Sequence, residues 1–234
     1  MNTDHRYIKK QLSYRKHHRS YEDPPVGSAL KFRRKELNMT LEEAAEDICS
    51  VSYLSKVENN IIQPNQKYIE QYEKRLNFKI DSQIYDPCYP DHLDQTINAL
   101  LFDQPFSELL RVHYINRDDH QAYIMKMASD ALDHDMDNML SYYSHLRMYI
   151  PNLTDVEIAI LFTCLAIFSI SLEHYEDAHE LMRMIPIHDQ TDPRILVIEK
   201  KYRLYAAFYL GMDTEIFNLQ DSFVQTLNNM HAYD

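Results

Sequence analysis

Residues 40–58 constrain the fold of this chain more than any other stretch, because they predict two short helices joined by a tight turn. Thr40, with Glu43 three residues later, is the pattern of a capping box, which begins a helix. One apolar face then follows at helical spacing and consists of Leu41, Ala44, Ala45 and Ile48. The chain has to turn near Cys49, after which Ser50 is placed to cap a second helix.

The second predicted helix has two faces of different chemistry. Its apolar face consists of Val51, Leu54 and Val57. Its other face carries Ser52, Tyr53, Ser55, Lys56 and Asn59. Serine and lysine side chains can hydrogen-bond to base edges in the major groove of DNA, which admits an α-helix. The amides at the start of the helix, together with Ser50, can hold a phosphate. The simpler alternative is a pair of surface helices in an ordinary helical domain.

Several segments around these helices occur in the order, and nearly at the spacing, of a known DNA-binding domain. They are residues 27–38, 40–45 and 53–59, followed by Pro64 and a helix that ends at Leu76. On these residues, segment 26–78 resembles the Xre/Cro-type helix-turn-helix domain of bacterial and phage repressors. The variant sequence of residues 48–60 is most similar to the regulators that sense peptide pheromones, the Rgg/PlcR-like group.

The resemblance implies roles for individual residues. The implied DNA-binding residues are Ser50, Val51, Ser52, Tyr53, Ser55, Lys56, Asn59, Asn60 and Gln63. It also implies that Arg34 pairs with Glu58 and links the first helix to the recognition helix, because such side chains can form a bidentate pair. The alternative is two unrelated exposed charges. Two positions depart from the pattern, since Leu41 replaces a common glutamine and Asn60 a common glycine.

Composition argues against an enzyme and against a bound cofactor. The chain has only two glycines, Gly27 and Gly211, which excludes glycine-rich phosphate loops and dinucleotide fingerprints. No Ser-His-Asp or Cys-His grouping has a recognisable local frame. The three cysteines lack metal-ligand spacing and the twelve histidines are scattered, so no metal is expected and the thiols should be free in a reducing cytoplasm.

Charge is divided sharply along the chain. Residues 1–80 hold 15 Lys and Arg against 11 Asp and Glu, whereas residues 81–234 hold 9 against 25. The first part can therefore attract DNA locally, while the acidic part should repel it. Residues 1–25 are basic, lack a clear apolar stripe and end in prolines, which predicts a disordered arm. The alternative is an arm that lies along phosphates or enters a minor groove.

The rest of the chain predicts an all-α protein. A five-helix DNA-binding domain is expected over residues 26–80 and a proline-containing linker over 81–91. Residues 92–234 show a helical pattern throughout, and the expected helix starts recur at intervals close to a two-helix repeat. One unit fits the tetratricopeptide (TPR) pattern and contains Phe162, Leu165, Ala166, Tyr175 and Ala178. A TPR-like array is thus expected, with an irregular helical bundle as the alternative.

Residues 156–172 come nearest to a membrane span, but they are short for a bilayer and hold Glu157, so they predict a buried helix. No basic-then-apolar segment lies at the start of the sequence, so no signal peptide is expected.

We therefore expect a cytoplasmic transcriptional regulator that binds double-stranded operator DNA as a homodimer, because two recognition helices must reach successive major grooves about 34 Å apart. The resemblance implies that the array senses a short peptide. One alternative is a repressor or antitoxin-like regulator whose helical domain only dimerises or binds a protein. A second is a helical-repeat adaptor without DNA binding.

Overall fold

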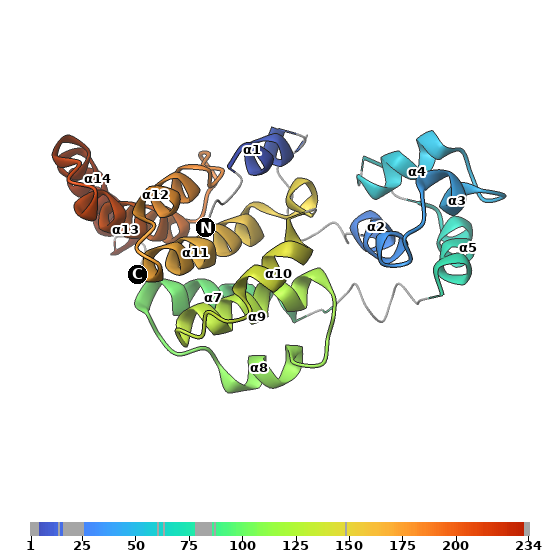
Figure 1. Ribbon diagram of the computed structural model, residues 1–234, viewed down its shortest axis with the longest axis horizontal. Coiled ribbons are helices and arrows are strands. Elements are labelled where there is room, and N and C mark those ends of the chain that lie inside the picture. The colour runs from blue at the N-terminus through green and yellow to red at the C-terminus, as the bar shows by residue number, and fades with distance from the viewer. Residues whose placement is uncertain are drawn as a thin grey trace. The chain divides into compact units, whose positions relative to one another are not determined.

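The computed structural model of the protein describes residues 5–13, 15, 26–59, 61–62, 64–77, 86, 88–147 and 149–231. The chain divides into two compact units. The first combines Met1–His18 with Pro90–Asp234, and the second is Arg19–Tyr89. All regular structure within the described ranges is helical, as the sequence predicts (Figure 1). None of the described helices is both long and apolar enough to cross a membrane.

The Arg19–Tyr89 unit is built from four described helices. They are α2 (Val26–Glu36), α3 (Leu41–Ala45), α4 (Val51–Glu58) and α5 (Gln66–Leu76). Their shared core consists of Val26, Leu30, Ala44, Ala45, Leu54, Val57, Tyr72 and Leu76. Five helices were expected here, and residues 78–85, which follow α5, lie outside the described residues.

Turns in this unit use asparagine and aspartate where many proteins use glycine. Asn38, Asp47 and Asn77 all have positive φ, between 47° and 59°. Short polar side chains tolerate this left-handed conformation better than other non-glycine residues. Asp47 also explains why α3 ends at Ala45, before Ile48, to which the sequence pattern had extended the apolar face.

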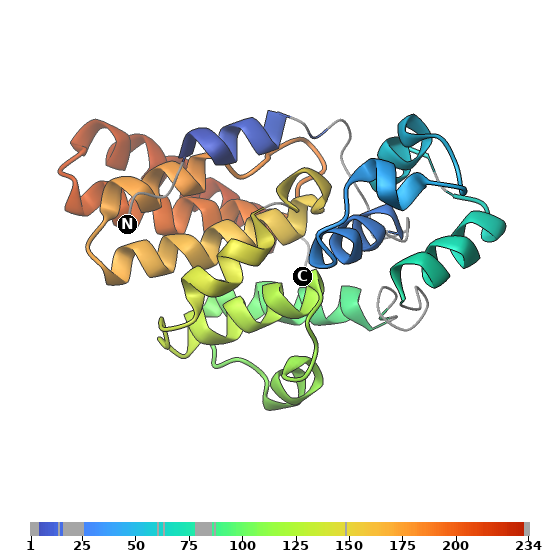
Figure 2. The ribbon, with the colours of Figure 1, turned by 45° about the vertical axis from the view of Figure 1, so that its right-hand side comes forward.

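The other unit is an array of consecutive helices (Figures 1 and 2). Its elements are α7 (Tyr89–Phe102), α8 (Glu108–Tyr114), α9 (His120–Leu132), α10 (Met139–Leu146), the 3-10 helix η1 (Ile150–Asn152), α11 (Asp155–Ser171), α12 (Tyr175–Arg183), α13 (Pro193–Tyr209) and α14 (Asp213–His231). From α11 onward each helix packs on the next one, and α11 also contacts α9 and α13.

Helix α11 is the centre of the array. Every residue from Glu157 to Ser169 is buried, because the helix is apolar on nearly all of its faces. It begins with a capping box in which Thr154 Oγ1 accepts from the Glu157 amide at 3.2 Å. Helices α11 and α12 pack on each other, and small and large side chains of the two are fully buried, namely Phe162, Leu165, Ala166 and Ala178. Tyr175 instead stacks on the Tyr209 ring, with centroids 4.5 Å apart.

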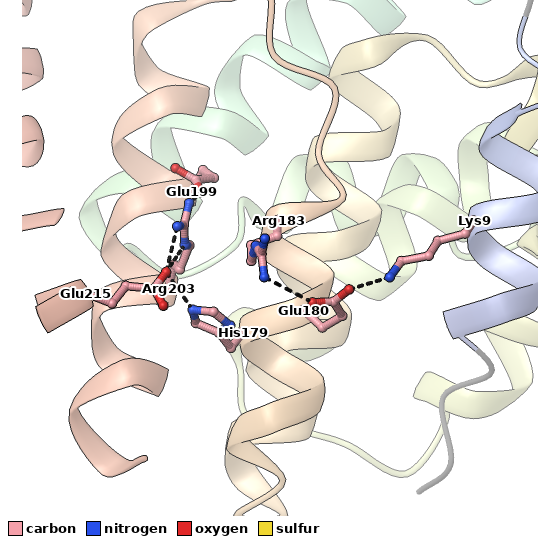
Figure 3. Close-up of polar contacts among 7 residues, drawn as sticks. All are labelled: Lys9, His179, Glu180, Arg183, Glu199, Arg203 and Glu215. Carbon is pink, nitrogen blue, oxygen red and sulfur yellow. Dashed lines mark hydrogen bonds and ion pairs between the residues drawn. The ribbon is translucent and has the colours of Figure 1, made fainter. Parts of the chain in front are cut away.

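Polar contacts join the last three helices of the array (Figure 3). His179 Nε2 on α12 lies 3.0 Å from Glu215 Oε1 on α14. Arg203 on α13 donates to the same oxygen at 2.6 and 2.9 Å, and to Glu199 at 2.8 Å. One carboxylate therefore ties three helices together at this end of the array.

The N-terminal segment differs from the expected disordered arm. Residues His5–Ser13 form helix α1, which belongs to the array unit and packs against η1. Ile8 is completely buried there. The apolar seam of α1 is too short to stand out in the sequence, and its other contacts join residues more than 130 positions apart, which no local pattern reveals.

Candidate nucleic-acid interface

Helix α4 is held at both ends by its own polar residues. At its start, Ser50 Oγ accepts a hydrogen bond from the Tyr53 amide at 3.2 Å. At its end, the Asn59 side chain donates to the Ser55 carbonyl at 2.7 Å and accepts from Lys31 Nζ at 3.2 Å. The Ser50 contact satisfies an amide that the first turn of a helix otherwise leaves to water, and the Asn59 contact adds a second donor to a carbonyl that already accepts from the Asn59 amide.

Helix α3 has only five residues and is fixed from both sides. The Thr40–Glu43 capping box forms, with Thr40 Oγ1 accepting from the Glu43 amide at 3.2 Å and Glu43 accepting from the Thr40 amide at 2.6 Å. At the other end, Arg75 of α5 donates to the carbonyls of Glu43 and Glu46 at 2.7 and 2.9 Å. The short helix is thereby fastened to α5 as well as to the turn before α4.

A buried ion pair fixes α4 to α2. Arg34 donates to both carboxylate oxygens of Glu58, at 2.6 and 2.8 Å, and its third contact is the Met39 carbonyl at 2.7 Å. Both side chains are more than nine-tenths buried. Donation to Glu58 raises the pKa of Arg34 above its ordinary value. Because each partner would otherwise be a buried unpaired charge, the pair restricts how α4 can lie on α2.

The outer face of α4 is open to solvent. Ser52, Lys56 and Asn59 are exposed, and Tyr53 and Ser55 are half-buried. Val51, which the sequence pattern assigned to the apolar face, is 37% exposed and belongs to the outer face instead. Leu54 and Val57 are buried on the opposite side. Asn60 and Gln63, two further candidates for DNA contacts, lie outside the described residues.

The arrangement of a capped short helix, a turn and a second helix with an open polar face agrees with a family comparison. Residues 30–83 match the family model described as Helix-turn-helix. These residues form an Xre-type helix-turn-helix domain. The chain therefore contains a helix-turn-helix DNA-binding domain, in which α3 and α4 are the paired helices and α4 takes the place of the recognition helix.

Comparison with whole proteins gives more distant likenesses. No curated protein sequence matches the chain significantly. Among solved structures, it is similar to Bacillus thuringiensis PlcR in complex with the peptide PapR7 and DNA, with 12% identity, a TM-score of 0.40, and coverage of 89% of this chain and 81% of that one. It is also similar to the PrgX/iCF10 complex, with 13% identity, a TM-score of 0.25, and coverage of 89% and 98%. The Streptococcus dysgalactiae SHP pheromone receptor Rgg2 gives 13% identity, a TM-score of 0.24, and coverage of 86% and 99%.

The helix-turn-helix domain also contains supporting contacts that the sequence did not indicate. Cys49, in the turn between α3 and α4, lies with its sulfur 2.8 Å from the Tyr72 hydroxyl of α5. Burial raises the pKa of Tyr72, so the hydroxyl stays protonated and available for this contact. Tyr53 packs its ring against Tyr68 of α5, with centroids 5.1 Å apart. The turn and the start of the recognition helix are thus braced by α5.

Proposed function

We propose that this chain is a dimeric, operator-specific transcription regulator whose helical array responds to a short peptide. The observation that carries the DNA-binding part is the open polar face of α4, held in place by the buried Arg34–Glu58 pair. A recognition helix must keep its orientation while its outer side chains meet base edges. Ser52 and Lys56 are exposed side chains of α4 able to hydrogen-bond to bases, and Ser50 stands beside the amides at the start of the helix, which can hold a phosphate.

Dimerisation is supported by an exposed aromatic surface on the array. Around the turn between α13 and α14, large apolar side chains are 36–69% exposed, and they are Tyr205, Phe208, Tyr209, Met212 and Phe217. We call this surface the α13–α14 aromatic patch. Exposed apolar patches of this kind mark protein interaction sites. A second copy of the chain is the fitting occupant, because operator binding through two grooves requires two recognition helices.

Peptide sensing is supported by the similarity of residues 48–60 to the peptide-responsive group and by the surface of the array. A hollow of about 800 Å³ lies at α13 and α14 and is lined by groups that include Arg203, Glu215, Asn218, Leu219 and Ser222. This size lies in the range of ligand sites, and the mixed lining offers donors and acceptors to a peptide backbone. The acidic array favours a basic or neutral peptide.

The decisive test is genome-wide DNA binding in the native host, comparing the natural chain with Lys56→Ala. We expect sharp sites that contain an inverted repeat and that disappear in the variant. In vitro, Lys56→Ala should weaken binding to the enriched site by about 1–3 kcal/mol, because one base contact is lost. Addition of spent culture medium would then show whether a secreted peptide changes occupancy.

A matched control is Lys74→Ala, which removes one exposed lysine from α5 of the same unit. It should leave sequence preference unchanged. Equal losses on the enriched site and on random DNA in Lys56→Ala would show that Lys56 contacts only phosphate. The absence of enriched sites under any condition would contradict the regulator proposal and favour a helical-repeat adaptor.

A further inference from the structure

The helical array carries a surface that binds a basic helix, and α1 of the same chain occupies it. Three cationic or potentially cationic side chains of the N-terminal segment meet carboxylates of the array. His5 Nε2 lies 2.6 Å from Asp177 Oδ1, and Lys9 Nζ lies 2.5 Å from Glu180 Oε1. Both acids are on α12, and Figure 3 shows Lys9 reaching Glu180 from α1.

The third contact extends beyond the end of α1. Arg15 pairs with Asp155, at the start of α11, and donates to the Leu153 carbonyl at 3.1 Å. Its side chain is only 10% exposed, and Asp155 also contacts His188 Nε2 at 3.0 Å. The segment is thus attached at two separated places along the array. The hydrogen bond from Lys9 lowers the pKa of Glu180, which keeps that acid charged.

Apolar contacts complete the surface. Ile8 is fully buried, which makes it the anchor of the helix. The Arg147 guanidinium lies over the Tyr7 ring, 5.4 Å from its centroid, which is the geometry of a cation–π contact. An amphipathic helix binds a protein surface through its apolar face, and here Ile8 makes the apolar contact while the charge pairs lie beside it.

The position of α1 in the chain gives this contact a consequence for DNA binding. The helix-turn-helix domain follows α1 in the sequence and precedes α7, so when α1 is docked both ends of the domain lead into segments held by the array unit. Docking also pairs His5, Lys9 and Arg15 with acids of the protein, which keeps these groups away from phosphates. Freed from the array, the same basic segment would add charge to the DNA-binding unit.

We propose that α1 is an internal ligand of the array, held in competition with external basic peptides and with DNA phosphates. Its binding surface comprises Arg147, Leu153, Asp155, Asp177 and Glu180. The external ligand that fits it is a short amphipathic helical peptide with one aliphatic anchor and cationic residues beside it. The effect on DNA binding rests on the proposed regulator function, whereas the docking of α1 does not.

The first experiment measures amide hydrogen exchange of α1 in the full-length chain. Ile8→Asp should speed exchange across residues 5–13 at least tenfold while leaving α11 protected. Lys9→Glu and Glu180→Lys should each speed it a few-fold, and the double variant should restore slow exchange by reversing the pair. Lys10→Glu is the control, because Lys10 is exposed on the same helix and should change little. Exchange of α1 that is already fast in the natural chain would overturn the proposal.

The second experiment tests competition with a synthetic peptide of residues 1–22 as the probe. The peptide should bind full-length Ile8→Asp at least tenfold more tightly than the natural chain, whose site is occupied. Equal binding to both proteins would overturn the proposal. If α1 docks on its own chain, its amide hydrogen exchange does not depend on protein concentration. A dependence on concentration would show that α1 docks on a second copy and would contradict docking within one chain.

The third measurement is the salt dependence of binding to random duplex DNA. Release of the basic segment in Ile8→Asp should steepen the slope of log affinity against log salt by about 1–3, because each new phosphate contact adds about 0.9. If hydrogen exchange shows that α1 is released but the salt-dependence slope is unchanged, the proposed competition between the array and DNA phosphates for α1 is overturned. If no DNA binding occurs in any variant, the regulator function fails, while exchange and peptide binding still decide whether α1 is an internal ligand.

Discussion

At the scale of single residues, the Arg34–Glu58 pair decides how the recognition helix is held. Two charges that are this deeply buried stabilise a domain only when both are present and well hydrogen-bonded, because each alone would keep its desolvation cost without a partner. Here Arg34 makes three hydrogen bonds, and one of them reaches the loop before α3. The pair therefore links α2, the α2–α3 loop and α4.

Arg34→Ala should destabilise the helix-turn-helix domain by about 3–5 kcal/mol, because it leaves Glu58 buried without a partner. Hydrogen exchange of residues 51–58 in the full-length chain, under increasing urea, measures this change. The control is Arg33→Ala, which removes the hydrogen bond to the Leu76 carbonyl and leaves no buried unpaired charge, so it should cost about 1 kcal/mol. Addition of Glu58→Ala to Arg34→Ala should cost less than the sum of the single changes, and simple additivity would contradict the coupling.

Much of this site was predictable from residue types at known spacing. The Thr40–Glu43 capping box, the Ser50 cap and the Arg34–Glu58 pair follow from the sequence and the family resemblance. The Arg75 contacts to α3 carbonyls were not predictable, because the backbone acceptors lie about 30 residues away and carry no side-chain signal. Periodicity places Val51 on the apolar face, whereas the family resemblance places it among the DNA-binding residues, and its 37% exposure contradicts only the first. Periodicity does not distinguish a core position from an apolar position at the edge of a helix.

At the scale of elements, α3 shows how a helix of five residues is kept. Nucleation of a helix is unfavourable, and an element of five residues therefore depends on its caps and on packing. Ala44 and Ala45 supply the packing, and both are almost fully buried. Thr40 supplies the cap at the N-terminal end, where the first amides need an acceptor.

Thr40→Ala should destabilise the helix-turn-helix domain by about 1 kcal/mol through loss of this cap. Urea denaturation followed by far-ultraviolet circular dichroism would measure the effect as an earlier transition of this domain. Ser52→Ala serves as the control, because Ser52 is exposed within α4 and has no capping role, so its change should stay within about 0.5 kcal/mol. A loss in Ser52→Ala as large as in Thr40→Ala would argue against the cap as the cause.

Helix α9 contains a carboxyl group that is costly to ionise. Burial, with a contribution from nearby Asp135, raises the pKa of Asp130 from 3.8 to about 6. One of its oxygens, Oδ2, is buried without a hydrogen-bond partner among the described residues. Between about pH 4 and pH 6 the folded state therefore holds a proton that the unfolded state has already lost. The contribution of Asp130 leaves the free energy of unfolding highest below about pH 4 and lowers it as the pH rises through about 6.

Asp130→Asn should remove this decline. The full pKa shift of Asp130 corresponds to about 3 kcal/mol of unfolding free energy. Because the side chain is partly open to solvent, the variant should gain about 1 kcal/mol of stability at pH 7. The measurement is the free energy of unfolding of the natural chain and of the variant at pH 4 and pH 7. Asp221→Asn, at an exposed position on α14, should show no such difference. A pH dependence that is the same in Asp130→Asn as in the natural chain would exclude Asp130 as its origin.

The ends of helices were predictable where the sequence contains residues that cap or break a helix. The expected helix at residues 66–76 is α5, and the expected helix at 155–171 is α11, because each is preceded by a polar cap residue. Helix α1 was not predictable, because Ile8 is its one fully buried side chain and its stability comes from contacts with α12 and the start of α11. Elements fixed by distant charges leave little local trace in a sequence.

At the scale of the whole molecule, the two units differ in their charge and in their exposed apolar surface. The basic part of the sequence contains the recognition helix, and the acidic part contains the α13–α14 aromatic patch. An acidic array does not attract DNA, so its exposed aromatic rings are suited to a protein partner. Phe208 and Phe217 are the most exposed rings of the patch, at 69% and 67%.

Phe217→Glu should separate the proposed dimer, because two such charges would have to enter one apolar interface without partners. Sedimentation of the full-length chain should show at least a tenfold weaker self-association, and binding to an inverted repeat should lose cooperativity while binding to one half-site persists. Leu109→Glu is the matched control, since Leu109 is an exposed apolar residue of α8 at 83%. Dissociation by Leu109→Glu alone would place the interface at α8. A dimer unchanged by Phe217→Glu would contradict the patch as the dimer surface, because a copy seated on it would have to bury this side chain.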